Sequence, residues 1–130
     1  MSVPAYKRRM SSIEYISQAQ ELLRITIKNC EKIPKRYTFF GVQHAYNIAQ
    51  QILDSCICAN NFNLNTFYEQ RTLCLQNALN SLACLSNHLQ TLMIYADELD
   101  DKKWLIWGRQ ITICEKLIKG VMKSDKERMV

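Results

Sequence analysis

The chain has 130 residues, of which 48% are apolar, so it can build the core of one domain but is too short for a multidomain enzyme. Only three glycines and two prolines are present, a scarcity that argues against a turn-rich sandwich or barrel and favours long helices. The net charge of +5 is unevenly spread, because residues 1–40 and 102–130 each carry +5 and residues 41–101 carry −5. Such segregation indicates a polyanion or an acidic partner.

Apolar spacing predicts the first two helices, over approximately residues 11–33 and 39–60. Ser11 and Ser12 resemble a serine cap of the first helix, and Pro34 ends it. The cluster of asparagines at residues 60–63 favours a turn after the second helix. The predicted core positions are Ile16, Ala19, Leu23, Ile27 and Cys30 in the first helix, and Val42, Ala45, Ala49, Ile52, Cys56 and Ala59 in the second.

Two further helices are predicted over approximately residues 65–97 and 100–124. Asn65 or Thr66 is the expected cap of the third helix. The acidic run at residues 97–101 suits the start of the fourth, because carboxylates are favourable at a helix N-terminus. The predicted core positions are Leu75, Ala78, Leu82, Leu85, Leu89, Leu92, Ala96 and Leu99, then Trp104, Trp107, Ile111, Cys114, Ile118 and Val121.

These four helices predict one all-α domain spanning residues 1–130, with short basic tails at both ends. Three of the helices are joined by short links, which favour antiparallel neighbours. The expected architecture is therefore an up-down-up-down four-helix bundle.

Basic residues recur every seven positions in the predicted fourth helix and form a stripe roughly opposite its core positions. In an up-down bundle the first and last helices are neighbours, so Arg24, Lys28 and Lys32 of the first helix can extend the basic surface of the fourth. The stripe is either a binding surface or simply a solvated face, and the segregated charge favours binding. Its residues are Lys102, Arg109, Lys116 and Lys123, and Lys119 and Lys126 lie on the neighbouring row of side chains along the helix.

The predicted fourth helix also has an apolar edge beside its core stripe, at Ile106, Ile113 and Leu117. The predicted third helix has apolar residues outside its main series as well, at residues 73, 79 and 93–95. Self-association through these residues would bury them. The alternative is that they pack inside a single bundle, whose helices then have wide apolar faces.

No pattern in the sequence indicates catalysis, a metal or a cofactor. A phosphate-binding glycine loop, a zinc-protease motif and a nucleophile elbow are all missing, and neither His44 nor His88 has a carboxylate at ligand spacing. The six cysteines are expected to be small buried side chains rather than disulfides or zinc ligands. Since neither a secretory signal nor a membrane span is found, we expect a cytoplasmic binding or scaffolding protein that is not an enzyme.

Four segments carry a resemblance to a known family. They are the N-terminal Lys7-Arg8-Arg9, the link Lys32-Ile33-Pro34-Lys35-Arg36-Tyr37, the helix start Trp104-x-x-Trp107-x-Arg109, and the ending Val121-Met122-Lys123-Ser124-Asp125-Lys126. Together they resemble the accessory variability determinant proteins of diversity-generating retroelements. That family is related to the four-helix bundle proteins encoded within ribosomal RNA intervening sequences.

The resemblance implies a homopentameric, barrel-like assembly of four-helix bundles that partners the reverse transcriptase of the element. The two proteins together would engage the template RNA, and possibly DNA, during error-prone cDNA synthesis for mutagenic retrohoming. Carried over by position, Lys35 and Arg36 of the link join the fourth-helix stripe as expected contact residues. Family members have more basic residues in the second and third helices, where this chain has almost none beyond Arg71, which argues against RNA contact there.

The alternative is a small helical interaction protein that does not bind nucleic acid. An intervening-sequence protein or a regulatory adaptor would use the same basic face to bind an acidic protein.

Overall fold

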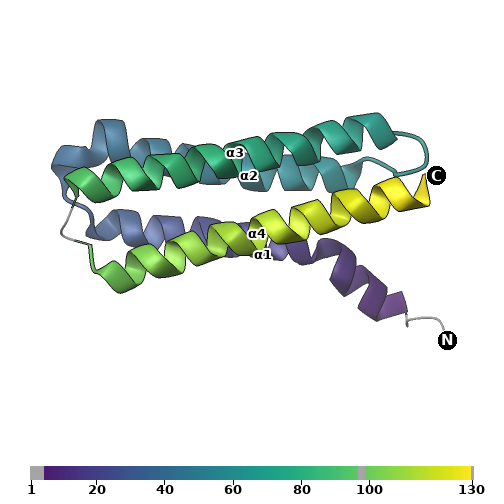
Figure 1. Ribbon diagram of the computed structural model, residues 1–130, viewed down its shortest axis with the longest axis horizontal. Coiled ribbons are helices and arrows are strands. Elements are labelled where there is room, and N and C mark those ends of the chain that lie inside the picture. Colours follow the sequence, from purple (N-terminus) through teal and green to yellow (C-terminus); the bar gives the residue numbers. More distant parts are fainter. Residues whose placement is uncertain (1–4, 97–98, 130) are drawn as a thin grey trace.

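The computed structural model describes residues 5–96 and 99–129, and within them it contains four α-helices and no strand. The helices are α1 (Ala5–Lys32), α2 (Gln43–Asn61), α3 (Tyr68–Tyr95) and α4 (Asp101–Arg128). Each packs against its neighbour in the chain, and α1 also packs against α4. Figure 1 shows α2 and α3 in one layer and α1 and α4 in the other. The prediction of an all-α chain with four bundled helices is confirmed.

Four helix ends differ from the prediction. α2 begins at Gln43 rather than near residue 39, because residues 38–42 form a π-helical turn. α1 begins at Ala5, so Ser11 lies inside the helix rather than at its cap, and its N-terminal part bends away from the other helices (Figure 1). The cap position of α3 is Phe67, without a side-chain cap. α4 extends to Arg128. The basic segments at residues 7–9 and 126–128 are therefore helical continuations instead of separate tails, because neither contains a helix breaker.

The start of α4 follows the prediction from its acidic residues. The side chain of Asp100 accepts a hydrogen bond from the backbone N–H of Lys102 at 3.2 Å, which satisfies one of the unpaired donors at the helix N-terminus. Asp97 and Glu98 lie outside the described residues.

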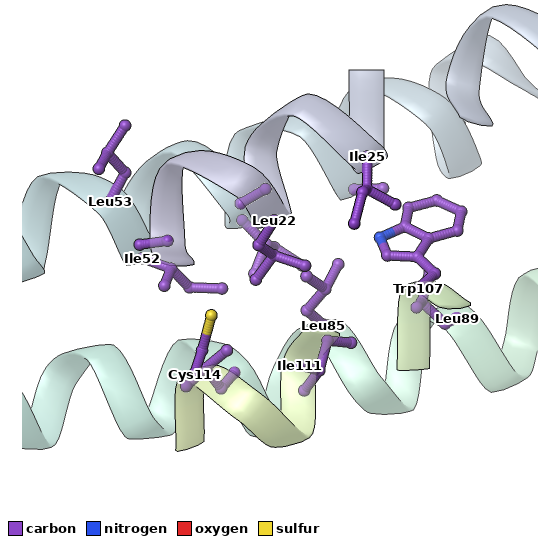
Figure 2. Close-up of a cluster of buried hydrophobic side chains, with 14 of the residues drawn as sticks. Leu22, Ile25, Ile52, Leu53, Leu85, Leu89, Trp107, Ile111 and Cys114 are labelled. Atoms are coloured by element: carbon purple, nitrogen blue, oxygen red, sulfur yellow. The ribbon is translucent and has the colours of Figure 1, made fainter. Parts of the chain in front are cut away.

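The core follows the predicted positions closely in three helices. Every predicted core position of α3 is buried, as are the predicted positions Ala96 and Leu99. Of the positions predicted for the second and fourth helices, only Val42 and Val121 are half-buried rather than buried. Figure 2 shows these side chains meeting between the layers, with Ile52, Leu85 and Ile111 converging from three helices. Period located these positions because few polar residues interrupt the apolar series, but it missed the buried Ile48, Leu53 and Gln110.

The predicted register of α1 is wrong. Ile27 is 40% exposed and Leu23 is only half-buried, whereas Tyr15, Leu22 and Thr26 are buried. The predicted register is wrong because it was derived from apolar residues alone, so the polar Thr26 was not considered as a core residue. Its hydroxyl donates to the carbonyl of Leu22 at 2.8 Å and accepts from the indole nitrogen of Trp107 at 2.9 Å, so burial leaves no unpaired group.

The link between α1 and α2 contains a short 3-10 turn, η1 (Lys35–Tyr37), followed by a π-helical turn, η2 (Thr38–Val42). Gly41 brings this link against α3, because a Cβ atom there would lie 2.6 Å from a methyl group of Leu92. The ring Nε2 of His88 lies 2.9 Å from the Gly41 carbonyl oxygen and ties α3 to the same turn.

A buried ion pair joins α3 to the C-terminal end of α4. Arg71 Nε lies 2.6 Å from Asp125 Oδ2, and Arg71 Nη1 donates to the carbonyl of Ala59 at 3.3 Å. The two side chains are only 13% and 4% exposed. Burial raises the pKa of Tyr15, which lies near this pair, to about 12, so that hydroxyl stays neutral at physiological pH. Asp125 lies beyond the predicted end of the fourth helix, and its partner 54 positions away could not be read from the sequence.

Candidate nucleic-acid interface

The basic stripe predicted on the fourth helix is an exposed feature of α4. Lys102, Arg109, Lys116 and Lys123, which we call the basic column, are all exposed. The helix turns about 100° per residue, so the column lies roughly opposite the buried Trp107. Within the described residues no carboxylate forms an ion pair with a lysine of this column. Its charges are consequently available to a partner.

Lys119 and Lys126 lie beside the basic column and are also exposed. Lys119 lines a groove between α4 and α3, together with Asn80, Ser86 and Thr112. Its ammonium group pairs with Glu115 at 2.7 Å, with the two side chains 61% and 44% exposed. Such an exposed pair contributes little stability, so Lys119 can exchange Glu115 for another anion at small cost.

Further basic residues come from α1 and from η1. Arg24, Lys28 and Lys32 are exposed on α1, which packs beside α4. Arg24 is paired with Glu21, and its hydrogen bonds lower the pKa of that carboxyl group. Lys35 is exposed in η1.

The link and the basic column are only partly brought together. The link lies at the end of the bundle where α4 begins, near Lys102, whereas Lys123 and Lys126 lie toward the other end (Figure 1). The exposed guanidinium of Arg36 lies over the ring of Tyr37, 4.7 Å from its centroid. Contact with one partner through both regions would therefore require a partner that extends along α4.

The layer formed by α2 and α3 presents mainly uncharged amides. The exposed asparagine and glutamine side chains of this layer include Gln43, Asn47, Gln51, Asn77, Asn80 and Asn87. Because Arg71 is held in its ion pair, these helices offer no described lysine or arginine that is exposed at the surface. Basic charge is thus concentrated on the layer that contains α1 and α4.

Apolar side chains border the basic column. Ile106 and Ile113 are 46% and 42% exposed, whereas Leu117 is half-buried and packs against the core. A groove of about 750 Å³ lies between the end of α3 and the first half of α4. It is lined by Met93, Trp104, Leu105, Gly108, Arg109 and Ile113 among others. Sequence reasoning missed the contribution of Leu105, which is 53% exposed and adjoins the core position of Trp104.

The described residues contain no group of three side chains placed to hold a metal ion. Burial raises the pKa of Cys30, Cys56 and Cys114 to about 12, so these thiols remain protonated and weakly reactive. Cys58 and Cys84 are exposed, contrary to the expectation that all six cysteines are buried. His44 is exposed, and His88 is half-buried and meets it edge to face, with ring centroids 4.6 Å apart.

None of the described helices combines the length and the apolar character that crossing a membrane requires. Exposed positive charge beside apolar surface is suited to binding a polyanion or a protein. In comparisons with known proteins, the sequence matches no family model and shows no significant similarity to a curated protein.

Proposed function

We propose that this chain is the non-catalytic accessory subunit of a diversity-generating retroelement, acting in the cytoplasm as a basic homo-oligomeric scaffold. It binds the reverse transcriptase together with template RNA or cDNA and so supports mutagenic retrohoming. The observation that carries the proposal is the basic column, which is exposed along α4 while the surfaces of α2 and α3 are nearly free of basic charge. The resemblance in the link and in the C-terminal segment supports the choice of partner.

The chemistry of the basic column supports a nucleic acid as the ligand. Lysine and arginine neutralise phosphates and release condensed counterions. This contribution to the binding free energy does not depend on the sequence of the nucleic acid. A partner running along α4 would meet Lys102 first and Lys123 last, over about 30 Å of helix. Because the lysines of the column have no described internal ion pair, binding would not have to break one there.

Removing charge from the basic column is expected to weaken RNA binding strongly. The variant carries Lys116→Gln and Lys123→Gln in the basic column and Lys119→Gln beside it. For a single strand, the loss of three phosphate contacts reduces the slope of log K against log salt by about 2 and the affinity about a hundredfold at 0.1 M salt. Fluorescence anisotropy with labelled template RNA over a salt series measures both quantities.

A control variant with the same net charge separates position from overall charge. Asn47→Asp, Gln51→Glu and Asn77→Asp also lower the net charge by three, but on the amide surface of α2 and α3. This variant should keep the salt slope and lose only a few-fold in affinity, because its new charges lie away from the ligand. Equal losses in both variants would contradict a role for the basic column. Failure of the unmodified protein to bind RNA at low salt and to copurify with the transcriptase would favour the alternative of a protein-only adaptor.

The oligomer is proposed to form through the apolar residues beside the basic column, with the pentamer taken from the resemblance. Replacing Ile106 and Ile113 by glutamine should shift the protein toward the 15.2 kDa monomer in analytical ultracentrifugation, because exposed apolar area drives association. Ile27→Gln with Ile57→Gln, which alters exposed apolar residues of α1 and α2, should leave the oligomer intact. A monomeric unmodified protein at micromolar concentration would contradict the scaffold.

A further inference from the structure

Two cysteines from different helices have their sulfur atoms in contact at one end of the bundle. Cys58 lies in the last turn of α2, and Cys74 lies in the second turn of α3. Their Sγ atoms are 3.2 Å apart, and the thiol of Cys74 donates a hydrogen bond to the sulfur of Cys58. A disulfide has an S–S distance of about 2.05 Å, so the two sulfurs need to approach by only about 1 Å.

Oxidants in solution can reach this pair. Cys58 is exposed and Cys74 is half-buried. Burial, together with the hydrogen bond to Cys58, raises the pKa of the Cys74 thiol to about 11. Cys74 therefore stays protonated at neutral pH, and Cys58 is the sulfur that solvent meets first.

The other four cysteines lack this combination of contact and access. Cys56 and Cys114 are fully buried, and Cys30 is half-buried with a pKa that burial raises to about 12. Cys84 is exposed, but no described sulfur atom lies within hydrogen-bonding reach of its thiol. Cys58 and Cys74 are thus the described pair that is arranged for cross-linking.

We propose that Cys58 and Cys74 are a modification site, at which a peroxide converts the two thiols into a reversible disulfide. The Cys58 sulfur first attacks one oxygen of hydrogen peroxide, the O–O bond breaks, and a sulfenic acid and one water result. The Cys74 sulfur then attacks the Cys58 sulfur as its thiol proton passes to the sulfenic oxygen, the S–O bond breaks, and a second water leaves. Two thiols have lost two electrons and two protons to one peroxide, and a dithiol reductant reverses the reaction.

The position of the pair gives the disulfide a structural consequence. The cross-link would join residues 16 positions apart and fix the end of α2 to the start of α3. Arg71 lies one turn before Cys74 and holds both the carbonyl of Ala59 and the carboxylate of Asp125. Oxidation would therefore clamp the end of the bundle where α2, α3 and α4 meet. This inference is independent of the proposed function.

The experiment uses the 130-residue protein in which Cys84→Ser removes the other exposed thiol, leaving five of the six cysteines. The protein is treated with hydrogen peroxide, quenched, denatured and alkylated, and the alkyl groups are counted by intact mass. We expect five groups before oxidation and three after, with five restored by dithiothreitol. The oxidised form should melt on the order of 10 °C higher, because a loop of this length loses unfolded-state entropy.

Adding Cys58→Ser to this background provides the control. Because Cys58 is exposed, the variant should keep its circular dichroism spectrum, and peroxide should then remove no pair of thiols. Retention of five alkylatable thiols in the Cys84→Ser protein would overturn the proposal. Loss of two thiols in the Cys58→Ser variant would also overturn it, since a different pair would then be reacting.

Discussion

Replacing Asp125 by asparagine is expected to destabilise the protein by about 3 to 5 kcal/mol, because the Arg71 guanidinium then remains buried without its counter-charge. The Asp125 side chain is 4% exposed and the Arg71 side chain 13%, so water cannot take over the lost interaction. Guanidinium denaturation followed by circular dichroism measures the change.

Two further variants test this explanation. Arg71→Met combined with Asp125→Leu removes both charges, so its stability should return to within about 1 to 2 kcal/mol of the unmodified protein. Glu115→Gln breaks the exposed pair with Lys119 and should cost less than about 1 kcal/mol. A loss below 1 kcal/mol for Asp125→Asn would mean that solvent reaches Arg71 and that the ion pair does not fix the end of α4.

Replacing Trp107 by alanine is expected to cost about 3 to 5 kcal/mol, since a large cavity would open where α1 meets α4. Trp107 has no exposed surface, and its ring stacks on Trp104 with centroids 5.7 Å apart. Its indole N–H also donates to the hydroxyl of Thr26 on α1. Circular dichroism is the suitable probe, because removing one of the two tryptophans changes the fluorescence directly.

Trp107→Phe separates packing from hydrogen bonding. Phenylalanine keeps an aromatic ring but lacks the N–H donor, so a smaller loss of about 1 to 2 kcal/mol is expected. The hydroxyl of Thr26 remains satisfied in this variant through the carbonyl of Leu22. Equal losses for the alanine and phenylalanine variants would show that the bond to Thr26, rather than ring volume, holds α1 against α4.

Apolar period located most of the buried positions in α2, α3 and α4, although it missed the buried Ile48 and Leu53 of α2. In α3 each step from Leu75 to Leu92 was predicted correctly. In α1 the same method chose Leu23 and Ile27, although Thr26 and Asn29 occupy the core. The hydroxyl of Thr26 is satisfied by Leu22 on the preceding turn and by Trp107 on α4, and a partner on another helix cannot be read from the order of residues.

The candidate interface also has features that the sequence predicted and features that it did not. The seven-residue spacing was enough to predict that Lys116 and Lys123 lie on the outer surface of α4, because helix geometry alone fixes that direction. The groove beside Leu105 and Arg109 was not predictable, since it depends on how far α3 and α4 diverge. Spacing likewise could not distinguish Leu117, which packs against the core, from the exposed Ile113.

By itself, the sequence determined the helical content, most of the inward-facing apolar residues of α2, α3 and α4, and the concentration of basic charge on the first and last helices, because these follow from local periodicity and composition. Only the tertiary structure decided which distant side chains meet. It paired Arg71 with Asp125, brought Cys58 to Cys74 and joined Thr26 to Trp107. Such contacts depend on the rotation and offset of whole helices against one another, which packing fixes after the helices have formed.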